Sequence, residues 1–138
     1  MSLETTAAFI TTMESTTRQS ASVIGNALKT IIARFQQLKS STDDLDDGTS
    51  ANDVEEALAS AGVALRDATG NFRDFDEVIM ELSSKWDTLD SNTQRYIATV
   101  GAGTRQQSQF IALVSNYAKN VENISTATNS AGAAEQQF

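Results

Sequence analysis

DFDEVIMELSSKWDTLDSNTQRYIATVGAGTRQQSQFIALVSNYAKNVENI, the stretch from Asp74 to Ile124, contains the features that decide the fold. It holds the only Trp, both Tyr and the densest set of large apolar residues in the chain. Three helix-start patterns follow one another within it, at Asp74, Ser91 and Thr104. Each pairs a polar capping residue with Glu or Gln three positions later. The stretch therefore predicts a helical core, and it contains no pattern of catalytic residues.

Length favours a single helical domain or fragment over residues 1–138, either one domain or a piece of a larger protein. Of the 138 residues, 40% are hydrophobic, and none is proline. The absence of proline suits long helices, because proline removes a backbone donor and clashes with the preceding turn. We expect a core over residues 14–128, an acidic loop over 39–51 and a small polar tail over 129–138 that frays.

Hydrophobic spacing predicts a mainly α fold, a helical bundle of about six helices. The expected helices cover residues 3–14, 20–38, 52–61, 74–89, 91–100 and 104–128, and a break near Asn120 in the last one is an open alternative. In two of them apolar residues repeat at intervals of four and three, at Ile24, Leu28, Ile31, Phe35 and Leu38, and at Phe110, Val114, Tyr117, Val121 and Ile124. A coiled coil needs three or four such heptads, and the seam over residues 20–38 covers only about two. We therefore interpret residues 20–38 as a helix that buries one face in a bundle.

Capping residues predict where the shorter helices begin and end. Asn52 and Glu55 form a capping-box pattern, as do Asp74 with Glu77. Gly62 suits the left-handed position that ends a helix.

A change of period predicts one short β-hairpin near residues 63–75, VALRDATGNFRDF. Val63 and Leu65 alternate with less apolar residues, as in a half-buried strand. Asp67 and Gly70 occupy the first and fourth positions of a type I turn. A lone hairpin is marginal in water, so we expect this one to pack on the helices.

The charge and residue inventory excludes several classes of function. The net charge is −8, which argues against binding nucleic acid through its phosphates and against docking on an anionic membrane. No apolar run approaches the ~20 residues of a membrane-spanning helix. The chain has no His and no Cys, so the commonest general base, the commonest zinc ligand and all disulfides are missing. We expect no contact with nucleic acid or membrane through this segment.

Three sequence patterns could indicate a chemical site, and for each of them a structural interpretation is better supported. A calcium loop beginning at Asp43 would place Leu45 and Val54 at two positions that require oxygen ligands. Gln106 replaces the third glycine of a dinucleotide-binding loop. The carboxylates at 74–81 suit a helix start, where they are stabilised by the helix dipole. We therefore expect no enzyme activity and no catalytic, cofactor or metal site.

Arg105 is the polar residue with the clearest possible contact to a partner. It lies at a predicted helix start, where a cation opposes the dipole. Our first expectation is a structural ion pair with Asp87 or Asp90. The sharper hypothesis is a contact between Arg105 and another protein of the same assembly.

Three blocks in one order carry a resemblance to a known family: VEEALASAGVALRDATGNFRDFDEVI (54–79), ELSSKWDTLDSNTQRYIAT (81–99) and GAGTRQQSQFIALVSNY (101–117). Together they resemble a segment of the phage tail tape measure protein family, and the resemblance covers about residues 14–134. Its most specific part runs from Gly103 to Gln107, followed by Phe110 to Leu113. None of these residues forms a catalytic motif.

The resemblance implies a structural role. Tape measure proteins are long helical chains inside the growing tail tube of long-tailed phages, and their length sets tail length. Their implied partners are the tail tube protein, tail assembly chaperones and further copies of themselves. The implied location is the virion tail, with the host cytoplasm during assembly.

The alternative function is a free-standing helical protein-binding module, secreted or adhesin-like. A short reading frame with its own start would favour that module over a segment of a long tail protein.

Overall fold

The structure, a computed structural model, describes residues 2–40, 44–45 and 47–136, and this part of the chain is mainly helical. It contains seven α-helices, two short 3₁₀ turns and no strand. In order they are α1 (Leu3–Thr17), α2 (Ala21–Ser40), α3 (Ala51–Ala59), α4 (Phe75–Lys85), η1 (Trp86–Thr88), α5 (Ser91–Ala102), η2 (Thr104–Gln106), α6 (Gln107–Val114) and α7 (Tyr117–Gln136). This confirms the mainly α prediction. The count exceeds six because the last predicted helix is two helices, α6 and α7.

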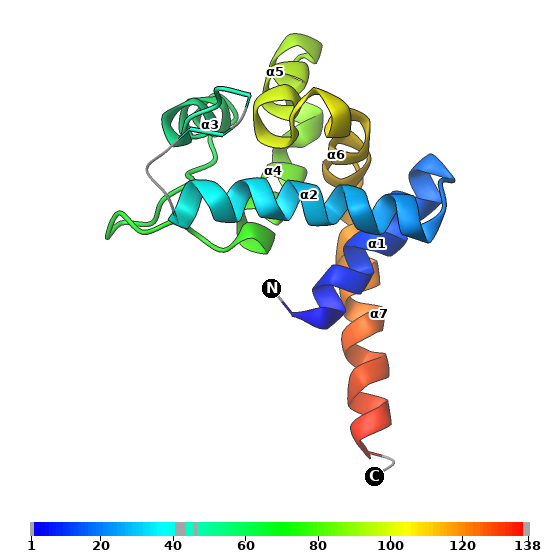
Figure 1. The fold of residues 1–138 in the computed structure, drawn as a ribbon. Coiled ribbons are helices and arrows are strands. Elements are labelled where there is room, and N and C mark those ends of the chain that lie inside the picture. The colour runs from blue at the N-terminus through cyan, green and yellow to red at the C-terminus, as the bar shows by residue number, and fades with distance from the viewer. Residues whose placement is uncertain (1, 41–43, 46, 137–138) are drawn as a thin grey trace.

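Helix α2 crosses the middle of the molecule (Figure 1). Helices α3, α5 and α6 lie on one side of it, and α1 and α7 lie on the other. Helix α1 packs along α7 and also contacts α6 and α2. The far half of α7 extends past α1 and away from the other helices (Figure 1).

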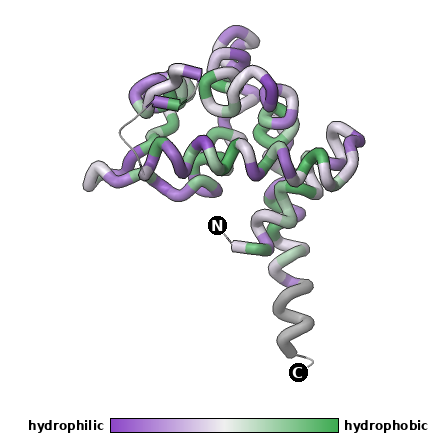
Figure 2. Tube along the Cα trace, in the orientation of Figure 1, coloured by the Kyte–Doolittle hydropathy of each residue, from purple (hydrophilic) through white to green (hydrophobic). Residues whose placement is uncertain are grey.

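The predicted apolar face of α2 is buried, as its spacing indicated. Hydropathy alternates along this helix, as expected when only one face is covered (Figure 2). The five seam residues are all at most 8% exposed: Ile24, Leu28, Ile31, Phe35 and Leu38. Residues of this face meet side chains from α1, α5 and α6, so α2 connects both sides of the molecule.

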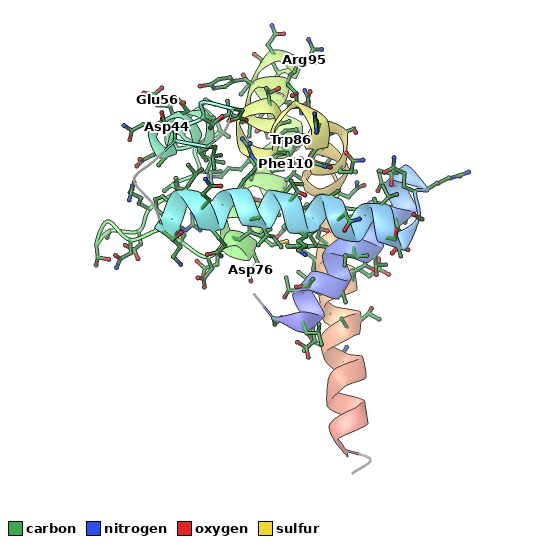
Figure 3. The ribbon with its side chains drawn as sticks, in the orientation of Figure 1. Asp44, Glu56, Asp76, Trp86, Arg95 and Phe110 are labelled. Atoms are coloured by element: carbon green, nitrogen blue, oxygen red, sulfur yellow. The ribbon has the colours of Figure 1, made fainter. Side chains whose placement is uncertain are left out.

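Trp86, the only Trp of the chain, anchors the core. Its side chain is 3% exposed, and its ring meets that of Phe110 edge to face at 6.3 Å between centroids (Figure 3). Such edge-to-face pairs are favoured by the aromatic quadrupole. The contact joins the end of α4 to α6.

Two predicted caps are displaced by one or two residues. Ser50, not Asn52, caps α3, and it forms a reciprocal capping box with Asp53. Asp90, not Ser91, caps α5 by accepting a hydrogen bond from the backbone N–H of Thr93 at 2.7 Å. Runs of adjacent capping residues make such one- and two-residue shifts possible, because several positions satisfy the same pattern.

Two further predicted end residues, Asp74 and Gly62, stand where the sequence placed them, with one difference in bonding. Asp74 occupies the N-cap of α4 but makes no side-chain capping bond. Gly62 has a φ of 74° just beyond α3, which fits the left-handed helix ending. The predicted start at Thr104 is the 3₁₀ turn η2, and α6 begins only at Gln107.

The predicted β-hairpin at residues 63–75 is wrong, because the structure shows only an isolated antiparallel bridge between Arg66 and Phe72. The turn itself is present. The N–H of Gly70 donates to the carbonyl of Asp67 at 3.0 Å, and Gly70 has a φ of 87°.

Side-chain contacts of Arg73 explain why the pairing stops after one bridge. Beyond Phe72, the carbonyl of Ala64 accepts a hydrogen bond from the Arg73 guanidinium at 2.9 Å instead of continuing a strand ladder. The same guanidinium reaches Glu81 of α4 at 3.2 Å. The chain then enters α4 at Phe75, so no room is left for a second strand.

The second predicted seam does not stay on one face. Phe110 and Val114 are at most 3% exposed, whereas Tyr117 and Val121 are each 45% exposed. The reason is a break at residues 115–116, between α6 and α7, which turns the later residues out of the core. The break lies before the position near Asn120 that we had left open.

The structure describes only part of the predicted acidic loop, and it describes the predicted tail as far as residue 136. Residues 41–43 and 46 of the acidic loop, with the Asp43 of the calcium alternative, lie outside the described residues. Leu45 within the same loop is buried at 5% exposed. The tail that we expected from residue 129 is helical as far as Gln136, and its fraying stays a prediction.

Candidate interaction site

An open groove of about 630 Å³ lies where α2, the loop after it and the α5–α6 connection meet. It contains Arg105 and four of the five residues of the Gly103–Gln107 pattern. Its lining consists of Thr30, Arg34, Gln37, Leu45, Asp47, Ala102, Gly103, Thr104, Arg105 and Gln106. Polar side chains from three segments therefore share this one groove.

Arg34 of α2 organises the groove. Its Nη2 donates to the carbonyl of Val100 at 2.9 Å, and its Nε donates to the carbonyl of Gly101 at 3.4 Å. These carbonyls belong to the last turn of α5, where the helix dipole is negative and carbonyls lack intrahelical partners. A cation at this position satisfies those carbonyls and joins α2 to α5.

The same guanidinium holds the acidic loop. Nη1 of Arg34 donates to Oδ2 of Asp47 at 2.8 Å, and Asp47 Oδ1 accepts from the backbone N–H of Thr49 at 3.0 Å. Hydrogen bonds from Thr49, assisted by Arg34, lower the pKa of Asp47 to about 2. Arg34 is only 15% exposed, so the loop closes over it.

Gly103 is required by the turn that follows α5. Its φ of 83° and ψ of 160° lie in a region open essentially to glycine alone. A Cβ there would also lie 3.2 Å from Nη1 of Arg34. The glycine therefore allows both the abrupt end of α5 and the close approach of Arg34.

Arg105 lies in η2 and is exposed, on the rim of the groove. The expected ion pair with Asp87 or Asp90 is wrong, since neither pair is present among the residues that the structure describes. Asp90 instead caps α5, and hydrogen bonds from the Thr93 side chain and backbone lower its pKa. A contact between Arg105 and a partner stays a prediction.

Sequence reasoning missed Arg34 as an organising residue. Arg34 lies in the later turns of its helix, where a cation suits the helix dipole without any further partner. The carbonyls that it reaches are 66 and 67 positions away, and no local pattern links residues at such separation. The glycine break after α5 was the only visible sign that this helix end needed a partner.

The carboxylates near the start of α4 are engaged by a cation. Arg73 lies 3.2 Å from Glu81 and 3.9 Å from Glu77. Among the described residues, no group of three or more acidic side chains is placed to hold a metal ion. Within those same ranges, no helix has the length and hydrophobicity to cross a membrane.

Comparison with known proteins gives one family match. Residues 1–103 match the model of the family described as phage-related minor tail protein. The match runs from α1 to the glycine turn after α5, so it includes α2, Arg34 and Gly103. No solved structure matches the chain.

Alanine substitutions at the two glycines near Arg34, Gly101 and Gly103, should change the free energy of unfolding in opposite directions. Gly103→Ala should destabilise the fold by about 1–3 kcal/mol, because its backbone conformation suits only glycine. Gly101→Ala, the matched control, should stabilise it by about 0.5–1 kcal/mol. Gly101 lies within α5, and an added Cβ there would meet the Phe110 ring at an ordinary 3.6 Å. Urea unfolding measures both, and equal effects would contradict this account of the turn.

The lowered pKa of Asp47 predicts that the folded state loses stability in acid. Its pKa is about 2 in the folded chain against 3.8 ordinarily, so ionised Asp47 favours the folded state above about pH 4. That contribution is lost as the pH falls from about 4 towards 2. Urea midpoints of Asp47→Asn should therefore fall less than those of the wild type over this interval. Asp44→Asn, a change to an exposed carboxylate in the same loop, should leave the wild-type pH dependence unchanged.

Proposed function

The chain belongs to the phage-related minor tail protein family, and we propose that it is a non-enzymatic structural segment of a tail tape measure protein. Membership in a tail protein family implies a location in the virion tail. The observation that carries the proposal is the family match over residues 1–103, joined to a mainly helical fold in which α2 buries a heptad-spaced face. In this role the segment helps to set tail length and to assemble the tail tube.

The sequence blocks quoted above support the tape measure assignment. They extend past the matched residues, through the Gly103–Gln107 pattern and into α6. The structure gives these residues structural uses, since they end α5, line the groove and begin α6. A ruler protein needs such residues to shape helices and to place contacts.

Helix length sets what this segment can contribute to a ruler. Laid end to end as one helix, 138 residues would span about 200 Å at 1.5 Å per residue. In the present fold the longest helices, α2 and α7, have 20 residues each and span about 30 Å. The proposed ruler function therefore requires the folded domain to open into longer helices within the tail.

The groove around Arg105 is a suitable surface for an assembly partner. Arg105 is exposed there, while Arg34 and Asp47 are bound to each other. We propose that acidic or carbonyl groups of the tail tube protein or of a tail assembly chaperone contact Arg105. This assembly step belongs to the host cytoplasm, before the finished tail holds the protein.

An in-frame deletion of this segment from its parent gene tests the ruler function. Tails should shorten by the order of 200 Å, as seen by electron microscopy of assembled particles. Replacement by an unrelated helical sequence of equal length is the control, and it should restore the length. Tails of normal length after the deletion would contradict the ruler role, and an intact free-standing product would favour the binding-module alternative.

Charge reversal tests the partner contact separately. Arg105→Glu should weaken capture of the tube protein or chaperone by several-fold, because it replaces an attractive charge with a repulsive one. Arg95→Glu is the matched control, since Arg95 is also exposed but does not line the groove and projects from α5 away from α2, at the top of Figure 3. Equal binding by the wild type and both variants would remove Arg105 from the interface.

A further inference from the structure

The connection between α6 and α7 is an elbow made of two residues, Ser115 and Asn116. Neither is glycine or proline, the residues that usually stop a helix. Ser115 has a φ of −82° and a ψ of 1°, in the bridge region next to the helical one, so a rotation about ψ alone returns it to helical values. The local sequence therefore permits a straight helix through this point, and the bend must have another cause.

Side chains hold the elbow by capping three consecutive carbonyls. Asn116 Nδ2 donates to the carbonyl of Ala112 at 2.7 Å, and Asn120 Nδ2 donates to that of Leu113 at 2.8 Å. Ser83 Oγ of α4 donates to the carbonyl of Val114 at 2.7 Å. In a straight helix the backbone N–H groups four residues later would bond these carbonyls. The elbow thus replaces three backbone bonds with three side-chain bonds.

The apolar spacing continues through the elbow as though the helix were straight. Phe110, Val114, Tyr117, Val121 and Ile124 step by four, three, four and three. The bend interrupts this seam and leaves Tyr117 and Val121 each 45% exposed. A straight α6–α7 helix would place all five on one face.

Polar side chains hold α7 against α1. Asn123 Nδ2 donates to Thr12 Oγ1 at 2.9 Å, and Asn116 Nδ2 donates to Thr16 Oγ1 at 3.1 Å. Asn120 is fully buried, and its Oδ1 has no partner in the described part of the chain. Breaking these polar pairs changes the free energy little, because the separated groups bond to water. The buried acceptor without a partner adds a cost in free energy to the packed state. The contact is therefore specific but separable.

We propose that α7 exchanges between two copies of this chain, through straightening of the α6–α7 elbow. In the exchanged dimer, α7 of each copy packs on α1 of the other and remakes the same Asn–Thr hydrogen bonds. The straight helices also regain backbone bonds at residues 112–114 and bring Tyr117 and Val121 to the new contact between the copies. Exchange of an identical element through a short hinge is a low-cost route to a dimer. The proposal does not depend on the tape measure function.

Disulfide cross-linking distinguishes the exchanged dimer from every other form. The chain has no cysteine, so introduced thiols are the only ones present. Chains carrying Thr12→Cys and chains carrying Asn123→Cys are mixed, unfolded in urea, refolded at high concentration and oxidised. The expected product is a covalent dimer of one chain of each kind on a non-reducing gel. A single chain carrying both changes reports whether the α1–α7 contact supports a disulfide, because dilute refolding should close it within one chain.

Two substitutions in the elbow should change the yield of the covalent dimer in opposite directions. Asn116→Ala removes a carbonyl cap and raises helix propensity, so it should increase the covalent dimer several-fold. Tyr117→Pro should abolish it, because proline suits the first position of α7 but removes a donor and clashes inside a straight helix. Circular dichroism of each variant confirms that the helices form.

Three results would overturn the proposal, two from the cross-linking and one from the elbow variants. One is closure of the disulfide within the doubly substituted chain while the mixed chains give no covalent dimer. Another is a dimer by light scattering that does not cross-link in the mixture, which would mean that Tyr117 and Val121 join intact copies. Equal yields from the Asn116→Ala and Tyr117→Pro backgrounds would show that elbow straightening plays no part.

Discussion

Burial of the apolar face of α2 is the interaction on which the rest of the structure depends. Leu28 and Ile31, each 1% exposed, lie near the middle of a helix that contacts α1 on one side and α5 and α6 on the other. Burying one such side chain contributes about 1.5–3 kcal/mol. The same helix carries Arg34, which satisfies the carbonyls at the end of α5. Core packing and the polar groove are therefore positioned by one element.

The α1–α7 contact has a different character from this core. Phe9 and Met13 of α1 are fully buried, and Ile124 of α7 packs against the same core. The side-chain hydrogen bonds from α1 to α7 and to the elbow join Thr to Asn. Hydrogen bonds of this kind add only about 0.5–1.5 kcal/mol each, because the separated groups bond to water. The core built on α2 can therefore stay folded when α7 separates from it. In the proposed ruler role, this asymmetry would release α7 as the domain opens into longer helices.

Those parts of the fold that depend on local pattern were predictable from sequence. The α2 seam, the core position of Trp86 and the turn at Gly70 all follow from spacing or residue type over a few positions. The hairpin was not predictable, because alternation at Val63 and Leu65 is also satisfied by a loop with one bridge. Arg73 decides between the two through contacts with α4 that no period reveals.

The missed features of the site share one cause. The elbow after Val114 is set partly by Ser83, 31 positions earlier, and the end of α5 is completed by Arg34 of α2. Both are side-chain contacts to backbone carbonyls across long sequence separation. The sequence did single out Arg105 and the glycines before it, since exposure and turn geometry are local properties.

Amide hydrogen exchange under native conditions tests the central claim most directly, that an apolar body built on α2 holds a separable α7. The account predicts the highest opening free energy for amides around Leu28 and Ile31, near that of global unfolding. It predicts a lower value, shared by one cooperative unit, for amides of α7 around Asn120. Equal opening free energies for α2 and α7 would contradict it, because the two helices would then unfold only together.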